Sequence, residues 1–589
     1  MRSFRINAPG PDVKSIHGLR ARGSLSPTPP MSSFWLTVWA TTLSCSWLLP
    51  NHYLPWTAFH TDAWSGLAFL GAAIVVLLRF KKPVEWHLSA VVVAVACFIP
   101  AIQHLAGLVL FAGQAWIVSL YLLGLLGALL LGQRWEQAQA GQLADGLLLA
   151  IGLASIVSVT LQLQTWLGLI DTGIFDIWTM GLSGARPYAN LGQPNQLATL
   201  LLWGLLGGAW AVHTRRIGAI AFLSFAMFLL MGIALTQSRT AWIGLSFLVA
   251  CTWYWRHLWR SRRLPWIATG LFICFWTINP LLHMLQEFLG FETSGEYFRQ
   301  GPQGDLRFAA WELFSRAVTE HPWLGYGWTT VGRAQLSLAE AFPPLYPTFG
   351  HSHNLFLDFA LWLGLPLGLL FSASLIWWSV RTFLKVSDAG SAILVMCLGA
   401  VGIHAMLEFP LNYAYFLLPA GAMAGILNQR GGGRVWETPR WSFLAILTIA
   451  ALLLAVVIRD YFRVESSYRE ARFENARIGT LPIGQPPDVI VLDQLSENIN
   501  FMRYDVKEGM STSQLDALVK VATAYPGGGR SYKVAKALAL NGRASDASRW
   551  LRTVCKISDP AECAVIQQVW ARDAANNPLI AAVPWPTSK

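Results

Sequence analysis

Side-chain amides that could contact a sugar or a phosphate gather in one short motif of this chain. It reads Arg-Pro-Tyr-Ala-Asn-Leu-Gly-Gln-Pro-Asn-Gln over residues 186–196 and contains four amides: Asn190, Gln193, Asn195 and Gln196. Capping of the apolar helix that follows would use only one such side chain. We therefore predict that these amides, together with Arg186, bind an oxygen-rich substrate.

Further arginines follow the same theme. Gln237-Ser-Arg239-Thr lies between two apolar segments, and Arg307 lies with Arg299 in a long polar connection. Arginine suits a diphosphate because its fork makes two parallel hydrogen bonds and its charge does not titrate. The alternative for Arg239 is a side chain that reaches lipid headgroups. We predict that Arg186, Arg239 and Arg307 bind a diphosphate and that Gln237 contacts the same substrate.

Two histidines could transfer a proton. His351 and His353 precede Asn354, where a polar loop meets a long apolar segment. Histidine titrates near neutral pH, which suits general base catalysis. Metal binding is the main alternative, but the outer loops hold no cluster with metal-ligand spacing. We predict His353 as the general base, His351 as its support or an acceptor contact, Asn354 as a substrate contact, and no metal or other cofactor.

Another polar boundary follows later in the chain. Glu408 and Tyr413 lie there with His404 and Asn412, between two apolar segments. We predict that Glu408 and Tyr413 line the same cavity as the histidines and bind substrate.

The elements that position these residues must cross a membrane. Of 589 residues, 54% are hydrophobic, 13% are charged and 29 are Trp, which a soluble domain of this length does not show. A net charge of +11 could suggest nucleic acid, but the basic residues sit in short loops between apolar segments, where they signal topology, so we expect no nucleic-acid partner. Thirteen spans of membrane length are predicted at about 33–50, 63–79, 86–104, 115–132, 143–161, 197–213, 217–236, 240–255, 264–283, 354–380, 390–408, 412–428 and 441–458.

Basic residues orient these spans. Every second connection is basic, so those connections are predicted to be cytoplasmic and the polar motifs to lie on the outer face. The fold class predicted is an all-α polytopic membrane protein with about 12–13 transmembrane helices. Its predicted parts are a cytoplasmic N-terminal tail (1–32), a first membrane region (33–283) with an outer loop at 162–196, a long periplasmic loop (284–353), a second membrane region (354–458) and a helical periplasmic domain (459–589).

The C-terminal part has ordinary soluble composition. Residues 535–551 predict a helix, an Asn-Gly turn and a second helix, similar to one tetratricopeptide-like hairpin or an ordinary helical pair. Cys555 and Cys563 lie in this part, and an oxidising compartment would permit them to pair.

The motifs together resemble a known family. The chain is similar to bacterial protein O-oligosaccharyltransferases of the pilin-glycosylation ligase type, within the O-antigen ligase and polymerase superfamily. The resemblance covers most of the chain and rests on the order of Arg186-Pro-x-x-Asn190-x-x-Gln193-Pro-Asn195, Gln237-Ser-Arg239-Thr, His321-Pro-x-x-Gly-x-Gly327 and His351-Ser-His-Asn354. Phe409 stands where family members often have Tyr, so a hydroxyl there would have to come from Tyr413 or Tyr415.

The resemblance implies a function. The family transfers an oligosaccharide en bloc from undecaprenyl diphosphate to a Ser or Thr of a periplasmic protein, often a pilin, without a metal. It also implies the lipid bilayer as environment and the bacterial inner membrane as location, with the active site facing the periplasm. A lipopolysaccharide O-antigen ligase and an O-antigen polymerase are alternatives that use the same donor. A lipid-linked sugar flippase is another, although no internal repeat typical of transporters is present.

Overall fold

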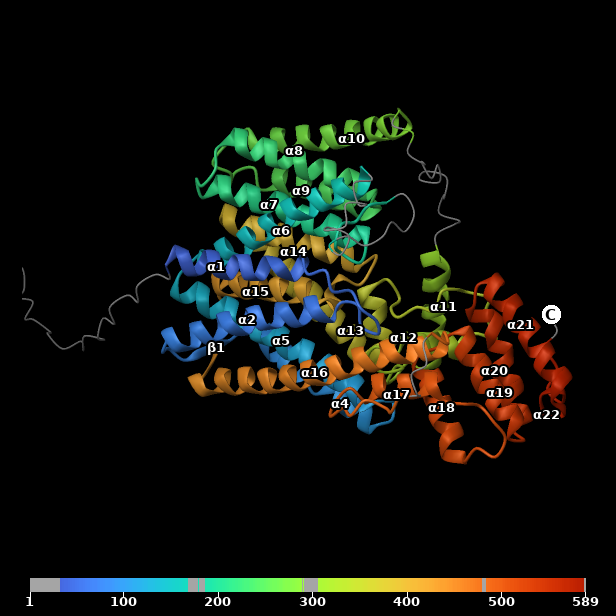
Figure 1. Cartoon of the computed structure of the whole chain (residues 1–589). Helices are drawn as coiled ribbons and strands as arrows, with labels where there is room; N and C mark the ends of the chain where they lie inside the picture. Colours follow the sequence, from blue (N-terminus) through green and yellow to red (C-terminus); the bar gives the residue numbers. More distant parts are fainter. Residues whose placement is uncertain are drawn as a thin grey trace, which may run out of the picture.

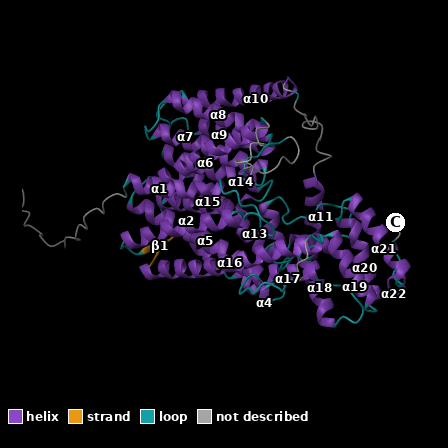
Figure 2. Cartoon of the chain, viewed as in Figure 1, coloured by secondary structure: helices purple, strands orange, loops and turns teal. Residues whose placement is uncertain are grey.

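The fold is described from a computed structural model, which covers residues 32–167, 178, 186–288, 290, 306–478 and 484–586. This part of the chain is an all-α polytopic membrane protein, and its only β structure is a pair of three-residue strands (Figure 2). The first membrane region contains α1 (Ser33–Ser44), α2 (Phe59–Arg79), β1 (Val84–Trp86), α3 (Leu88–Ala96), α4 (Ile99–Leu105), α5 (Ala112–Ala138), α6 (Gln142–Trp166), α7 (Pro194–His213), α8 (Ala219–Thr236), α9 (Arg239–Tyr254) and α10 (Leu264–Phe288). The remaining elements are α11 (Leu306–Glu320), α12 (Val331–Leu338), α13 (Leu355–Leu384), α14 (Ala389–Ala405), α15 (Ala414–Gly431), β2 (Trp436–Thr438), α16 (Arg440–Asn475), α17 (Asp493–Arg503), α18 (Thr512–Ala524), α19 (Gly528–Leu540), α20 (Ala544–Ile557), α21 (Pro560–Asn576) and α22 (Pro578–Ala581).

Each predicted span coincides with helix. Within the described residues, nine helical segments are long and apolar enough to cross a membrane, and Ala389–Ala405 is a shorter apolar helix. Some boundaries differ from the prediction. The span predicted at 33–50 is helical only to Ser44 before a short 3-10 turn, and the span at 86–104 divides into α3 and α4. The outer loop predicted from residue 162 begins later, because α6 continues to Trp166.

The basic connections meet at one end of the bundle. There β1 pairs antiparallel with β2, far away in sequence, with Glu85 opposite Glu437. Close by, the Arg430 guanidinium lies 2.8 Å from Glu136, and Lys385 donates to the carbonyl of Gly431 at 2.8 Å. Figure 1 shows this strand pair at one end of the molecule and the C-terminal helices at the other. The bundle therefore has two chemically distinct ends.

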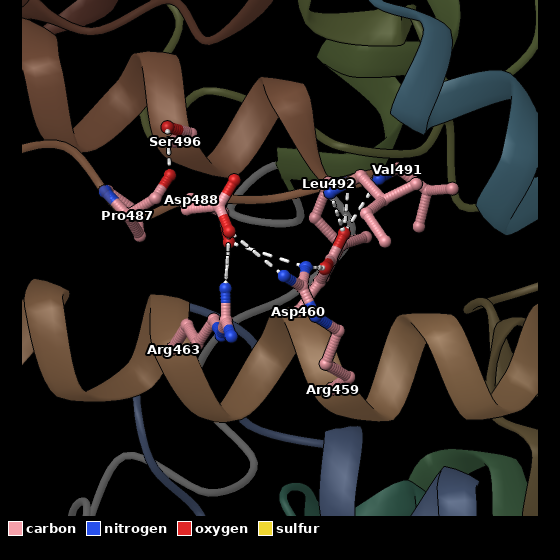
Figure 3. A network of polar contacts seen from close by, with 9 residues as sticks. Arg459, Asp460, Arg463, Pro487, Asp488, Val491, Leu492 and Ser496 are labelled. Carbon is pink, nitrogen blue, oxygen red and sulfur yellow. Dashed lines mark hydrogen bonds and ion pairs between the residues drawn. The ribbon is translucent and has the colours of Figure 1, made fainter.

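Helix α16 joins the bundle to the C-terminal domain. The span predicted to end at 458 continues without a break to Asn475, so the membrane helix and the amphipathic segment are one rod (Figure 1). The buried carboxylate of Asp460 accepts backbone N–H bonds from Ile490, Val491 and Leu492 at the start of α17 (Figure 3). Beside it, Arg463 binds Asp488 at 2.5 Å. These contacts attach the domain to the end of the rod.

The C-terminal domain is built from helical hairpins. Helix α19, the turn at Asn541–Gly542 and helix α20 form the predicted hairpin, and buried apolar residues of α18 to α22 form a separate core. Phe111, from the connection before α5, is buried in that same core. Cys555 and Cys563 form a disulfide between α20 and α21. The domain is thus packed onto the bundle as well as joined to it.

The long connection between α10 and α13 packs against a break in α13. Gly364 has φ +74° inside that helix, which interrupts its backbone hydrogen bonds. The turn after α11 supplies replacements, since Tyr326 N–H donates to the Leu361 carbonyl at 2.7 Å and Leu365 N–H donates to the Pro322 carbonyl at 2.6 Å. A Cβ on Gly364 would lie 2.4 Å from backbone atoms of Trp323. This contact fixes the half of α13 that follows the two histidines.

Candidate functional site

The carboxylate of Glu408 is the centre of the polar cluster. It follows α14, is only 6% exposed and forms an ion pair with Arg307 at the start of α11. Its other oxygen lies 3.0 Å from Nδ1 of His353. Asn195 Nδ2 donates to the carboxylate at 3.2 Å, and Gln193 Nε2 lies 3.5 Å away. One side chain therefore joins three motifs that are far apart in sequence.

A tight loop presents the histidines. The Asn354 side chain caps α13 by accepting from the backbone N–H groups of Phe356 and Leu357. Ser352 N–H donates to Asp358 at 2.8 Å, and the Ser352 carbonyl accepts from the Trp311 indole at 2.9 Å. Between these anchors, His353 has φ +59°, a left-handed conformation that is uncommon for residues other than glycine and clusters at functional sites.

His351 packs between an aromatic ring and an amide. Its ring stacks on Phe409 with centroids 4.5 Å apart, and the Asn412 amide nitrogen lies 2.8 Å from its Nε2. Asp358 is 3.8 Å from Nδ1. Phe409, at the position where the resemblance suggested Tyr, also meets His353 edge-on at 5.6 Å. The ring of Phe409 therefore contacts both histidines.

These environments lower the pKa values of His351 and Glu408, which favours the neutral form of the histidine and the charged form of the carboxylate. Burial and the neighbouring His353 lower the pKa of His351 to about 3, so at neutral pH it is uncharged and weakly basic. Burial alone would raise the pKa of Glu408, but the adjacent His353 ring and the guanidinium of Arg307 lower it to about 2. Glu408 is therefore ionised at neutral pH and suited to orient a basic ring.

The amide motif and the turn between α8 and α9 lie against each other. Arg186 donates to the Thr236 carbonyl through Nε and Nη2, at 3.1 and 3.0 Å, and to the Gln237 carbonyl at 3.3 Å. Ser238 caps α9 and donates to Asn195 Oδ1 at 2.6 Å. Asn195 therefore bridges this turn to Glu408. Gln237 has φ +51°, and Arg239 begins α9 with an exposed side chain.

Two of the amides face the protein interior. Asn190 is 1% exposed, donates to the Leu49 carbonyl at 2.6 Å and lies 3.1 Å from His52. Gln196, also 1% exposed, accepts from the Tyr415 hydroxyl at 2.8 Å. These contacts hold the motif against the loop after α1 and against α15. The prediction that they touch substrate stays a prediction.

An apolar cavity opens beside the cluster. It has a volume of about 1410 Å³, and Phe409, His351, Asn412 and Tyr413 form part of its wall. The rest is largely aliphatic and aromatic, from α3, α5, α13, α14 and α15, and reaches along α13 from Leu355 to Leu384. Such a shape suits a long hydrocarbon chain whose polar end lies at the histidines.

The structure therefore brings most of the predicted residues to one place. Arg307, Glu408, His353, Asn195 and Gln193 are in direct contact, while Arg186, Gln237 and Arg239 share the adjoining turn. Asn354 acts as the cap of α13, and Tyr413 lines the cavity. Arg299 lies outside the described residues. In the part of the chain that the structure covers, no group of three or more His, Cys, Asp or Glu side chains is arranged to hold a metal ion.

Sequence reasoning missed one buried carboxylate. Asp62 of α2 is 6% exposed, accepts from the Tyr121 hydroxyl at 2.6 Å and from the Ala414 N–H at 2.6 Å, and lines the cavity. It caps the start of α15 and so supports the segment that carries Phe409 and Asn412. The signal was available, since an ionisable residue at the edge of an apolar span, here directly before the span predicted at 63–79, is a candidate functional group.

Comparison with known proteins identifies the family. The chain is 30% identical to the general O-oligosaccharyltransferase of Acinetobacter baylyi (strain ATCC 33305 / BD413 / ADP1) over 502 residues, which cover 82% of this chain and 86% of the relative. The chain belongs to the O-oligosaccharyltransferase family. It is therefore a glycosyltransferase of O-linked protein glycosylation.

Other matches agree with this assignment. A second relative, the ComP-specific O-oligosaccharyltransferase of the same organism, is 28% identical over 358 residues, 59% of this chain and 64% of the relative. Family models match as protein glycosylation ligase at 187–210, O-antigen ligase at 201–372 and the C-terminal part of virulence factor membrane-bound polymerase at 392–557. The first two matches cover the amide motif, the Arg239 turn and the histidine loop.

Proposed function

We propose that this family member transfers a preassembled oligosaccharide from undecaprenyl diphosphate to a Ser or Thr hydroxyl of a pilin-like periplasmic protein. The observation that carries the proposal is the Glu408 carboxylate, which contacts both His353 and Arg307 beside a large apolar cavity. A base, cations and a slot for a lipid chain are the three features that this reaction needs. The donor, the acceptor class and the residue roles are all part of the proposal.

The proposed step is a single substitution at the anomeric carbon. The acceptor oxygen bonds to that carbon, the bond from the carbon to the diphosphate oxygen breaks, and the hydroxyl proton passes to Nε2 of His353. Glu408 at Nδ1 sets the ring orientation and stabilises the imidazolium that forms, as the carboxylate does in other carboxylate–histidine pairs. The diphosphate leaves with the bonding electrons.

The arginines are proposed to stabilise the leaving group. Arg307 lies at the cluster itself, and Arg186 and Arg239 lie at the adjoining turn. Cations held in place before the reaction stabilise developing negative charge without reorganisation. The undecaprenyl chain is proposed to lie in the apolar cavity, so that the lipid stays in an apolar environment throughout the reaction.

We further propose that the site faces the periplasm of a bacterial inner membrane. Support comes from the disulfide in the C-terminal domain, which suits an oxidising compartment, and from the basic residues at the opposite end of the bundle. An alkaline phosphatase fused after residue 589 should be active, and a green fluorescent protein fused there should be dark. The reverse pattern would remove this orientation.

Reconstitution tests the reaction. The purified chain in liposomes with an undecaprenyl-diphosphate-linked glycan should glycosylate a purified pilin, and mass spectrometry should find the intact glycan on Ser or Thr. The His353→Ala protein serves as the control. Glycan on lipid A-core would instead indicate an O-antigen ligase, glycan chains that lengthen on the carrier would indicate a polymerase, and lipid that only changes leaflet would indicate a flippase.

A further inference from the structure

A second cavity lies where the long loop meets the C-terminal domain. The loop docks on α20, since Leu345 N–H donates to the Lys556 carbonyl at 2.9 Å and Glu340 pairs with Arg552 at 2.6 Å. Next to this contact is a cavity of about 650 Å³ between Tyr346–Thr348 of the loop, the outer end of α16, and Gly527–Lys533 of the domain.

This cavity connects to the catalytic one. Thr348 and Arg530 line both cavities, and Thr348 is only five residues before His353 in the chain. The two spaces therefore adjoin at these residues, and together they outline a path from the C-terminal domain to the histidine loop. The path approaches the cluster from the domain, while the apolar part of the first cavity extends along α13 among the membrane helices.

A cation without a carboxylate partner lies at the junction. Arg530 of α19 is half-buried, its Nη2 donates to the Asn498 amide oxygen at 3.1 Å, and among the described residues it forms no ion pair. Burial lowers the pKa of this guanidinium from its ordinary value, which reflects a poorly solvated charge. A half-buried charge without a counter-ion costs stability, so an anion supplied from outside would compensate it.

Other charges in the cavity already have partners in the fold. Lys533 donates to the carbonyls of Phe501 and Met502 at 2.6 and 3.2 Å, which caps the end of α17. Glu562 lies in the first turn of α21 and accepts from Gly529 N–H at 3.3 Å. Asp559 caps α21 by accepting from the Glu562 N–H. Arg530 is thus the lining charge with the least compensation.

We propose that this second cavity receives an extended segment of the acceptor polypeptide and that Arg530 binds a carboxylate on that segment. The inference rests on the proposed function and adds an acceptor preference to it. Gly527 and Gly529 line the cavity without side chains, so an extended chain can approach the backbone there closely. Tyr346, Tyr468 and Phe501 add aromatic surface for its side chains.

A polypeptide fits this place better than a lipid headgroup. The cavity is formed by the C-terminal domain, the long loop and the last two turns of α16, where charged residues such as Arg469, Glu470 and Arg472 replace the apolar run of the helix. A segment bound there would point along the path toward His353, with a Ser or Thr in advance of the acidic residue. The carboxylate would then fix the register of the acceptor as well as its affinity.

Paired peptides and paired variants test the proposal. The probes are short synthetic peptides with one Ser, identical except for Asp or Asn at the flanking positions, in liposomes with lipid-linked glycan. The wild-type chain should have a KM for the Asp peptide about tenfold or more below that for the Asn peptide, with similar kcat. Arg530→Gln should remove this difference, and Arg530→Lys should restore part of it. Lys507→Gln, on an exposed side chain of the same domain, is the matched control.

A direct binding measurement separates folding from recognition. Fluorescence anisotropy should give weaker binding of the Asp peptide to Arg530→Gln, while the Tm of that variant should be no lower than that of Lys507→Gln. Equal use of both peptides by the wild-type chain would overturn the inference and leave the proposed function intact. A changed donor KM in Arg530→Gln would also overturn it, since Arg530 would then serve the diphosphate or an anionic lipid. If the wild-type chain glycosylates neither peptides nor pilin, the proposed function itself falls.

Discussion

Glu408 and His353 lie 3.0 Å apart although 55 positions separate them in the chain, and the carboxylate meets the ring at Nδ1. The relationship leaves Nε2 as the nitrogen for proton transfer. The same carboxylate pairs with Arg307, so the base and a cation are positioned by one group. The first two predictions follow from this arrangement.

Glu408→Gln should lower the transfer rate by about 10²–10⁴ because the neutral amide no longer stabilises the imidazolium or orients the ring. The isosteric change should preserve folding. The measurement is kcat in reconstituted liposomes. Glu437→Gln, an exposed carboxylate in β2 at the opposite end of the bundle, is the control and should transfer normally. Normal transfer by Glu408→Gln would show that the carboxylate does not orient the base.

His353→Ala should lower transfer by about 10²–10⁴ while donor affinity stays close to that of the wild-type chain, because the arginines remain. His351→Ala should act differently. It removes a ring packed against Phe409, so thermal stability should fall together with activity. Transfer rate, donor Kd and Tm are to be measured side by side. If only His351→Ala loses transfer while binding and stability are retained, the two roles must be exchanged.

Arg239→Lys should be clearly impaired, with a loss of about 10²–10³ in rate, since lysine keeps the charge but not the bidentate fork. Arg239 begins α9 next to the Ser238 cap, so the change leaves the cap and its bond to Asn195 in place. Arg256→Lys, at the opposite end of α9, is a matched control. Near-normal transfer by a well-expressed Arg239→Ala protein would exclude this arginine from donor binding.

Acid should destabilise the protein through His351. Its pKa is about 3 in the folded state, below the ordinary value of 6.5, so between these values the unfolded chain binds the extra proton. This contribution to stability is complete above about pH 6.5 and is lost as the pH falls toward 3. The slope reaches about 1.4 kcal/mol per pH unit for one group. Unfolding of the detergent-solubilised chain between pH 7 and 5 measures it, and His351→Gln should flatten the curve. Parallel curves for both proteins would contradict the buried, neutral state of His351.

Gly364→Ala should destabilise the protein by about 1–3 kcal/mol. Alanine is strained at φ +74°, and its Cβ would press on the backbone of Trp323. The backbone hydrogen bonds between α13 and the turn after α11 would weaken, so transfer should fall as well. Gly152→Ala in α6 is the control, because a Cβ there meets nothing within 4 Å and the residue lies outside the cavity lining. Thermal unfolding of the two variants distinguishes a local clash at residue 364 from the effect of any Gly→Ala change in a helix. Equal Tm values would show that the break accepts a side chain.

The membrane spans and the site motifs could be read from the sequence because both are local signals. A hydrocarbon core about 30 Å thick demands about 20 apolar residues in a row, and each of the thirteen predicted segments contains helix. Arg186 to Gln196, Arg239 and the histidine pair stood out as polar groups beside such segments. The Asn-Gly turn between α19 and α20 could also be predicted, since the backbone preferences of these two residues are enough to favour a turn.

Which side chains meet was decided only by the tertiary structure. Glu408 looked like one more substrate contact, yet packing of α14 against α7 and the docking of α11 place it between Arg307, His353 and Asn195. No sequence spacing predicts that, because the helices that carry these residues meet through side-chain packing in the bundle. Two further contacts depend in the same way on backbone groups that are far apart in sequence. The turn at Gly325 packs against the break at Gly364, and Asp62 accepts from the first N–H of α15.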